Sequence, residues 1–76
     1  MSNKVFIERL NQQLDEIGIP KQSSERVEAL AKLLHIPRVK AELLLSGSTK
    51  DLVNITKLAD EFEVKLDWLL GNSNKH

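Results

Sequence analysis

The 76-residue sequence predicts an all-α fold, a compact domain of five helices with a central helix-turn-helix. Apolar residues recur every three or four positions through most of the chain, whereas the period-two alternation of strands persists nowhere. Glycine and proline mark the ends of the periodic segments, as they do at helix boundaries. Because the chain has no cysteine, its stability must come from packed helices or from a second copy of the chain.

The first helix is expected over about residues 3–17, with Ser2 or Asn3 as its cap. Gly18 and Pro20 then end it. Its inner face repeats at spacings of four, four and three, through Phe6, Leu10, Leu14 and Ile17. The second helix is expected to begin after Ser23 or Ser24 as the N-cap. It has the strongest periodic signal in the chain, carried by Val27, Leu30, Ala31 and Leu34.

The third helix is expected over about residues 37–46, since proline is tolerated in a first helical turn. Ala41, Leu44 and Leu45 form its predicted inner face, and Gly47 is placed as a left-handed C-cap. Ser48, Thr49 or Asp51 is expected to cap the fourth helix, which ends at Val64. Its predicted inner face comprises Leu52, Ile55, Ala59 and Phe62. A short fifth helix covers 66–70, so that the domain spans residues 1–71 and residues 72–76 form a polar tail.

The charge distribution is uneven although the net charge is zero. Residues 1–20 hold two basic and three acidic groups, residues 21–50 six and three, and residues 51–76 three and five. The net positive charge therefore falls on the segment predicted as the helix-turn-helix, where a phosphate backbone would sense it.

Several functional classes lack their motifs in this sequence. It has no apolar run that spans a membrane and no secretory signal, so a cytoplasmic location is expected. No nucleophile–base constellation, phosphate-binding glycine loop, cofactor fingerprint or metal-ligand spacing occurs. The sequence therefore predicts a protein that is not an enzyme, with no cofactor, no metal and no small-molecule substrate.

Four residues have the spacing that a helix-turn-helix needs for close packing of its two helices. Ala31 lets the helices approach, Ile36 seals the turn, and Ala41 and Leu44 complete the inner face. With these positions and the terminal stretch "VKLDWLLG", residues 5–71 resemble the lambda-repressor-like, Cro/CI-type helix-turn-helix domains. The resemblance is strongest to the N-terminal domains of phage repressors.

This resemblance implies a homodimeric transcriptional regulator whose third helix enters the major groove of double-stranded DNA. The implied base-reading residues on the third helix are Arg38, Val39, Glu42 and Leu43. The implied contacts to the DNA backbone are Ser24, Lys32, Lys40, Ser46, Ser48, Thr49, Lys50 and Asn54. The resemblance and the small size of the core predict a dimer interface on the fifth helix, at Leu66, Leu69 and Leu70.

The chain departs from the family pattern at three positions. His35 stands where members usually have a left-handed glycine, Pro37 where they often have a capping serine or threonine, and Val27 where many have a bracing glutamine. The zero net charge, Val27 in place of the polar brace, and Val39 and Leu43 on the outer face motivate an alternative, a protein-interaction module on the same fold, such as an antirepressor or adaptor.

Some side chains admit more than one interpretation. Arg38 and Lys40 are either DNA contacts or ordinary solvated charges. Val39 and Leu43 read thymine methyl groups, bind a protein, or belong to the core if the helical phase is shifted by one residue. Trp68 is expected in the core or in a dimer seam. A solvated surface rather than a catalytic pair is expected for the acidic group Asp60, Glu61, Glu63 and Asp67.

Overall fold

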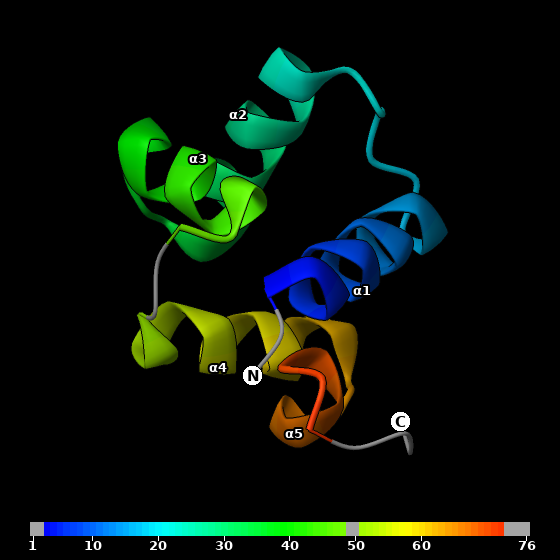
Figure 1. Cartoon of the computed structure of the whole chain (residues 1–76). Coiled ribbons are helices and arrows are strands. Elements are labelled where there is room, and N and C mark those ends of the chain that lie inside the picture. The colour runs from blue at the N-terminus through cyan, green and yellow to red at the C-terminus, as the bar shows by residue number, and fades with distance from the viewer. Residues whose placement is uncertain (1–2, 49–50, 73–76) are drawn as a thin grey trace.

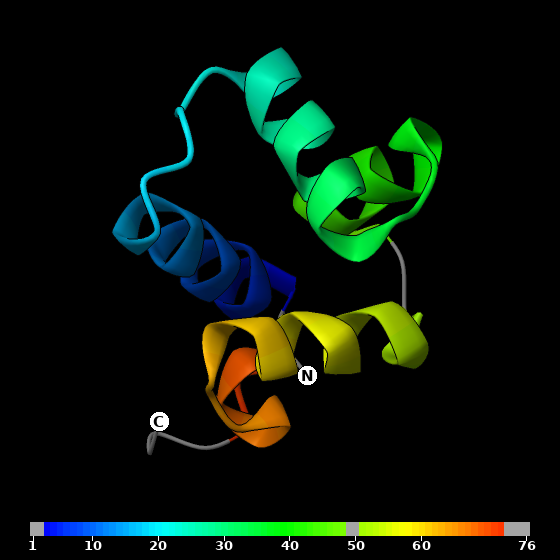
Figure 2. The same cartoon turned by 180° about the vertical axis from the view of Figure 1, so that it is seen from behind.

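The structure is a computed structural model that describes residues 3–48 and 51–72, and these residues form an all-α domain. Its five helices are α1 (Asn3–Glu16), α2 (Ser23–Leu34), α3 (Arg38–Ser46), α4 (Leu52–Phe62) and α5 (Leu66–Leu69). Figures 1 and 2 show α2 and α3 together at one end of the molecule and α4 and α5 at the other, with α1 between them. The predicted fold class of five helices is confirmed.

One apolar core joins all five helices. Its fully buried large side chains are Leu10, Leu14, Leu30, Leu44, Ile55, Leu58 and Leu69. Full burial of such a side chain contributes about 1.5–3 kcal/mol. The packing of these side chains therefore determines how the helices are arranged.

Left-handed residues end three of the helices, as the sequence indicated at two positions. His35 follows α2 at φ 56° and Gly47 follows α3 at φ 72°, which confirms both predictions. Glu63 follows α4 at φ 56° and was not foreseen. A side chain at positive φ is strained because its Cβ approaches the backbone closely, so His35 and Glu63 each reduce the stability of the fold.

Two residues expected on inner helix faces lie outside the core. Helix α1 ends at Glu16, so Ile17 is in the following turn and is 52% exposed, while Ile19 packs against the core. On α4 the buried arc follows Ile55, Leu58, Ala59 and Phe62. Leu52 is the first residue of α4, one turn before Ile55, and is 56% exposed at this end of the helix. The inner face of α4 therefore contains Leu58 where Leu52 was predicted.

The predicted helix ends need four further corrections. Helix α2 begins at Ser23, and the preceding Gln22 makes no side-chain cap bond, so neither Ser23 nor Ser24 is the N-cap. Pro37 precedes α3 rather than opening it. Of the predicted caps of α4, the structure has Asp51, which accepts a hydrogen bond of 3.3 Å from the Asn54 backbone N–H. Helix α4 ends before Val64. Helix α5 ends one residue before Leu70.

Candidate functional site

Helix α3 has one buried face and one face open to solvent. Ala41 and Leu44 are buried in the core. The outward side chains are all exposed, and they are Arg38, Val39, Lys40, Glu42, Leu43 and Ser46. Val39 is 66% exposed and Leu43 is 41% exposed, which excludes the interpretation that they belong to the core.

The turn between α2 and α3 determines where this outward face begins. The Ile36 backbone N–H donates to the Ala31 carbonyl across 3.0 Å, and the Ala41 N–H donates to the Pro37 carbonyl across 3.1 Å. Ala31 and Ile36 are partly buried against the core, as the helix-turn-helix spacing predicted. Arg38 is consequently the first residue of α3 and is exposed at its N-terminal end.

The predicted DNA-backbone residues have different surroundings. Ser24, Lys32, Lys40, Ser46 and Ser48 are exposed. Lys32 pairs with Glu28 at 3.7 Å within α2. Ser46 Oγ lies 3.1 Å from the Leu43 carbonyl, to which it donates, and 2.8 Å from Ser48 Oγ.

Three further residues, Asn54, Thr49 and Lys50, were predicted to contact the DNA backbone. Asn54 is buried, and its Nδ2 donates to Asp51 Oδ2 across 2.8 Å. Its amide group therefore completes the cap of α4, and the prediction that Asn54 contacts a phosphate is wrong. Thr49 and Lys50 lie outside the described residues.

The prediction that α5 presents Leu69 and Leu70 to a second copy is also wrong. Leu69 is 0% exposed and Leu70 is buried beside it in the core of the chain itself, so neither can contact a second copy while the domain is folded. Leu66 is half-buried and packs against the same core. Trp68 is buried, which confirms its expected place in the core, and the Arg9 guanidinium carbon lies 4.8 Å from the centre of its ring.

The helical pattern of the sequence did not predict the structural role of Arg26. It is only 5% exposed, and all five of its guanidinium N–H groups have acceptors. Its Nε donates to the Pro20 carbonyl, its Nη1 to the Asn11 carbonyl and Oδ1, and its Nη2 to the Ile19 carbonyl and Asp15 Oδ1. These five bonds span 2.6–3.3 Å and connect the N-terminal part of α2 to the end of α1 and the loop between them.

A signal for this role was present in the sequence. Arg26 lies four residues before Leu30 and eight before Leu34, which places it on the inward face of α2. A charged side chain at such a position needs polar partners, because an unpaired buried charge is strongly unfavourable. The apolar pattern alone does not indicate this need.

The ion pair of Arg26 with Asp15 also changes the chemistry of the carboxylate. Asp15 Oδ1 lies 2.6 Å from Arg26 Nη2, and 41% of the Asp15 side chain is exposed. The hydrogen bond from Arg26, together with the positive charges of Arg26 and Lys21, lowers the pKa of Asp15, while partial desolvation opposes this effect. The carboxylate is therefore ionised at neutral pH and the pair persists.

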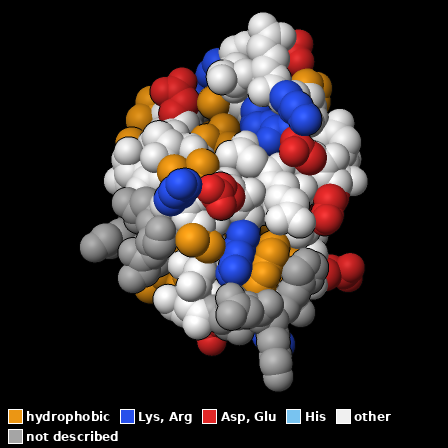
Figure 3. Space-filling view, turned by 45° about the vertical axis from the view of Figure 1, so that its right-hand side comes forward, with side chains coloured by type: hydrophobic (Ala, Val, Ile, Leu, Met, Phe, Trp, Pro, Cys, Tyr) orange, Lys and Arg blue, Asp and Glu red, His pale blue; other side chains and the backbone are white. Residues whose placement is uncertain are grey.

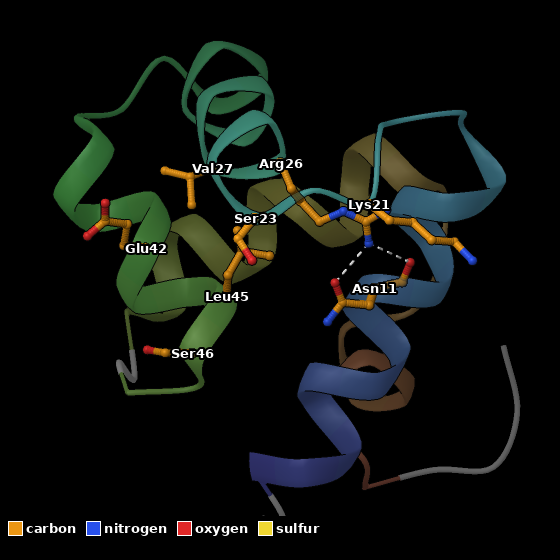
Figure 4. A pocket seen from close by; sticks show the side chains of 8 residues that line it. All are labelled: Asn11, Lys21, Ser23, Arg26, Val27, Glu42, Leu45 and Ser46. Atoms are coloured by element: carbon orange, nitrogen blue, oxygen red, sulfur yellow. Dashed lines mark hydrogen bonds between the residues drawn. The ribbon is translucent and has the colours of Figure 1, made fainter.

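An open cleft of about 320 Å³ lies between the end of α1 and the α2–α3 pair (Figure 4). Its lining comprises Asn11, Lys21, Ser23, Arg26, Val27, Glu42, Leu45 and Ser46. In the close view the Arg26 guanidinium is directed toward Asn11. Because its donors are all engaged within the chain, Arg26 supports the walls of this cleft and is not available to a ligand in it.

The surface of the domain carries charges of both signs. Figure 3 shows a face on which basic, acidic and apolar side chains are interspersed.

Among the helices of the described residues, none is long and apolar enough to cross a lipid bilayer. Within residues 3–48 and 51–72, His, Asp and Glu side chains form no group of three that could hold a metal ion.

These features define a small all-α domain in which one helix presents an exposed, mixed polar and apolar face. The family model of the BetR domain matches residues 1–76, and the chain belongs to this family. Searches of curated proteins and of solved structures find no match to the chain.

Proposed function

We propose that this chain is a sequence-specific transcriptional regulator, similar to phage repressors, that binds double-stranded DNA in the cytoplasm and has no catalytic role. In this proposal α3 enters the major groove, and two copies bind paired half-sites about 34 Å apart. Arg38 reads guanine, Glu42 accepts from cytosine, and Val39 and Leu43 contact thymine methyl groups.

The observation that carries the proposal is the division of α3 into a buried face and a face that is exposed to solvent. An α-helix with its side chains is about 10–12 Å in diameter and the major groove is about 12 Å wide, so the groove can admit α3. The exposed face bears a guanidinium, an ammonium, a carboxylate and two apolar side chains, the types that distinguish base edges. Lys40, Ser46 and Ser48 are exposed where they can contact phosphates beside it.

The first test is selection of duplexes from a randomised DNA pool at low salt, using the whole chain. We expect one enriched sequence, and an affinity that falls with salt at a slope of about 0.9 for each phosphate contacted. Failure to enrich any duplex would contradict DNA binding.

A second test separates base reading from phosphate binding with two variants of the same helix. Arg38→Ala should lose about 1–3 kcal/mol of binding free energy and relax the preference at one base position. Lys40→Ala should weaken binding to all sequences and reduce the salt slope by about 1. An unchanged selected sequence for Arg38→Ala would remove Arg38 from the site.

A protein-interaction module remains the second candidate, because Val39 and Leu43 are exposed apolar side chains on the outward face. A module of this kind, such as an antirepressor or adaptor, would bind its partner through these two residues. The salt titration discriminates the candidates, since a contact centred on apolar side chains depends much less on salt than one centred on phosphates.

A further inference from the structure

The outward face of α3 combines an apolar pair with basic neighbours. Val39 and Leu43 lie one helical turn apart, and they are therefore adjacent on the helix surface. Arg38 and Lys40 flank Val39, and both are exposed. The exposed Glu42 lies on the same face, so Arg38, Lys40 and Glu42 together leave it with a net charge of +1. We call Arg38, Val39, Lys40 and Leu43 the α3 patch.

The stretch from the connection after α4 into the first turn of α5 also combines two apolar side chains with charged neighbours, here of the opposite sign. Val64 and Leu66 are half-buried, so part of each side chain remains accessible. Glu63 and Asp67 flank them and are exposed. These four residues form the acidic segment. Asp60 and Glu61 are exposed just before it, so the segment remains acidic despite the exposed Lys65.

The two surfaces cannot meet within one molecule. Both views show α3 and α5 at opposite ends of the domain, separated by α1 and α4 (Figures 1 and 2). Because the two surfaces lie at opposite ends of the folded domain, a contact between them requires a second copy.

We propose that the α3 patch of one copy docks on the acidic segment of another copy, and that this contact competes with the partner of α3. Arg38 and Lys40 would meet Glu63 and Asp67, while Val39 and Leu43 would meet Val64 and Leu66. The competition with DNA rests on the function proposed above. The self-association itself does not, because it follows from the complementary charge and apolar pattern of the two surfaces.

Salt concentration is the first variable to test. Exposed charges interact over a Debye length of about 30 Å at 0.01 M salt and of about 3 Å at 1 M. Sedimentation equilibrium of the whole chain at millimolar concentration should give a weight-average mass clearly above the 8.6 kDa of one copy at low salt. At high salt the mass should return to that of one copy. A mass of 8.6 kDa at both salt concentrations would overturn the proposal.

A charge exchange then tests which surfaces are involved. Arg38→Glu/Lys40→Glu reverses the α3 patch, and Glu63→Lys/Asp67→Lys reverses the acidic segment. Each double variant alone should remain monomeric at low salt, whereas an equimolar mixture should associate because the reversed surfaces are again complementary. A mixture that stays monomeric would overturn the assignment.

Matched controls address charge and folding. Glu8→Lys changes the charge of an exposed residue on α1, away from both surfaces, and should associate like the unmodified chain. All four exchanged side chains are exposed, so the variants should unfold cooperatively by circular dichroism. The variant Val39→Ser keeps the charges and should weaken association by removing part of the apolar contact.

DNA binding distinguishes a failure of this inference from a failure of the proposed function. Glu63→Lys/Asp67→Lys keeps the α3 patch, so at low salt and at protein concentrations that favour self-association it should bind a selected duplex more tightly than Glu8→Lys/Glu16→Lys, which adds the same positive charge on α1. Self-association without DNA binding would refute only the proposed function, and DNA binding by a chain that is monomeric at low salt would refute only this inference.

Discussion

Replacing Arg26 with methionine tests how the end of α1 is held to α2. Methionine retains much of the apolar length of the side chain but removes all five donors. The carbonyls of Asn11, Ile19 and Pro20 then lose their charged partner, as does the Asp15 carboxylate. Arg26→Met therefore removes polar bonds at an almost fully buried position without creating a large cavity.

The bonds set the size of the expected loss. A hydrogen bond to a charged group contributes about 1.5–3 kcal/mol, and such contributions are not additive within one network. Pro20 is exposed and Ile19 is half-buried, so water can reach some of the released carbonyls. We therefore expect a loss of about 3 kcal/mol, against a total stability of about 4–11 kcal/mol for a domain of this size.

Urea unfolding followed by the fluorescence of Trp68, the single tryptophan, measures this loss in the free energy of unfolding. In a thermal melt, at about 4–8 °C for each kcal/mol, the melting temperature should fall by about 12–24 °C. Lys32→Met is the matched control, because Lys32 is an exposed cation on the same helix with one surface ion pair, and it should lose less than about 1 kcal/mol. Equal stability of the two variants would refute the structural role of Arg26.

Three further predictions concern ionisation and backbone conformation. Because the pKa of Asp15 is lowered below its ordinary value of 3.8, the pair with Arg26 contributes stability above this pH and loses it as the pH falls through the lowered pKa. Thermal melts in acid should therefore show a smaller fall for Asp15→Asn than for the unmodified chain, and parallel curves would contradict the ion pair. His35→Gly should raise stability by about 1 kcal/mol, since glycine relieves the strain at φ 56°, and chemical denaturation showing no gain would indicate that His35 is unstrained there. Gly71→Ala should lower the free energy of unfolding by roughly 1–3 kcal/mol more than Gly18→Ala in the same assay. Both glycines have φ 84°, but only at residue 71 would a Cβ lie 2.9 Å from a valine methyl carbon of α1. Equal losses for the two variants would show that the valine moves aside.

Much of the helical arrangement could be predicted because it depends on local physics. Helical spacing placed Leu10, Leu30 and Leu44 in the core, and each is buried. The turn chemistry likewise placed Gly47 in a left-handed conformation. These features need only the neighbouring residues and the 3.6-residue period.

The ends of helices and the interface residues were less predictable. Ile17 and Leu52 have apolar side chains in the right phase, yet Ile17 follows the end of α1 and Leu52 is the first residue of α4, and each is exposed. Leu69 and Leu70 have the composition expected of a dimer surface, but the remainder of the chain covers them. An apolar residue does not encode which surface buries it, so only the packed structure distinguishes a core from an interface.

The sequence by itself therefore determined the all-α class, the approximate helices and the outward face of α3 that begins at Arg38. The tertiary structure decided that Val39 and Leu43 are exposed, that Asn54 belongs to a helix cap, and that Arg26 connects α2 to α1. The physical reason is distance along the chain. Helix periodicity acts between residues three or four apart, whereas Arg26 finds acceptors up to fifteen residues away that only the fold brings together.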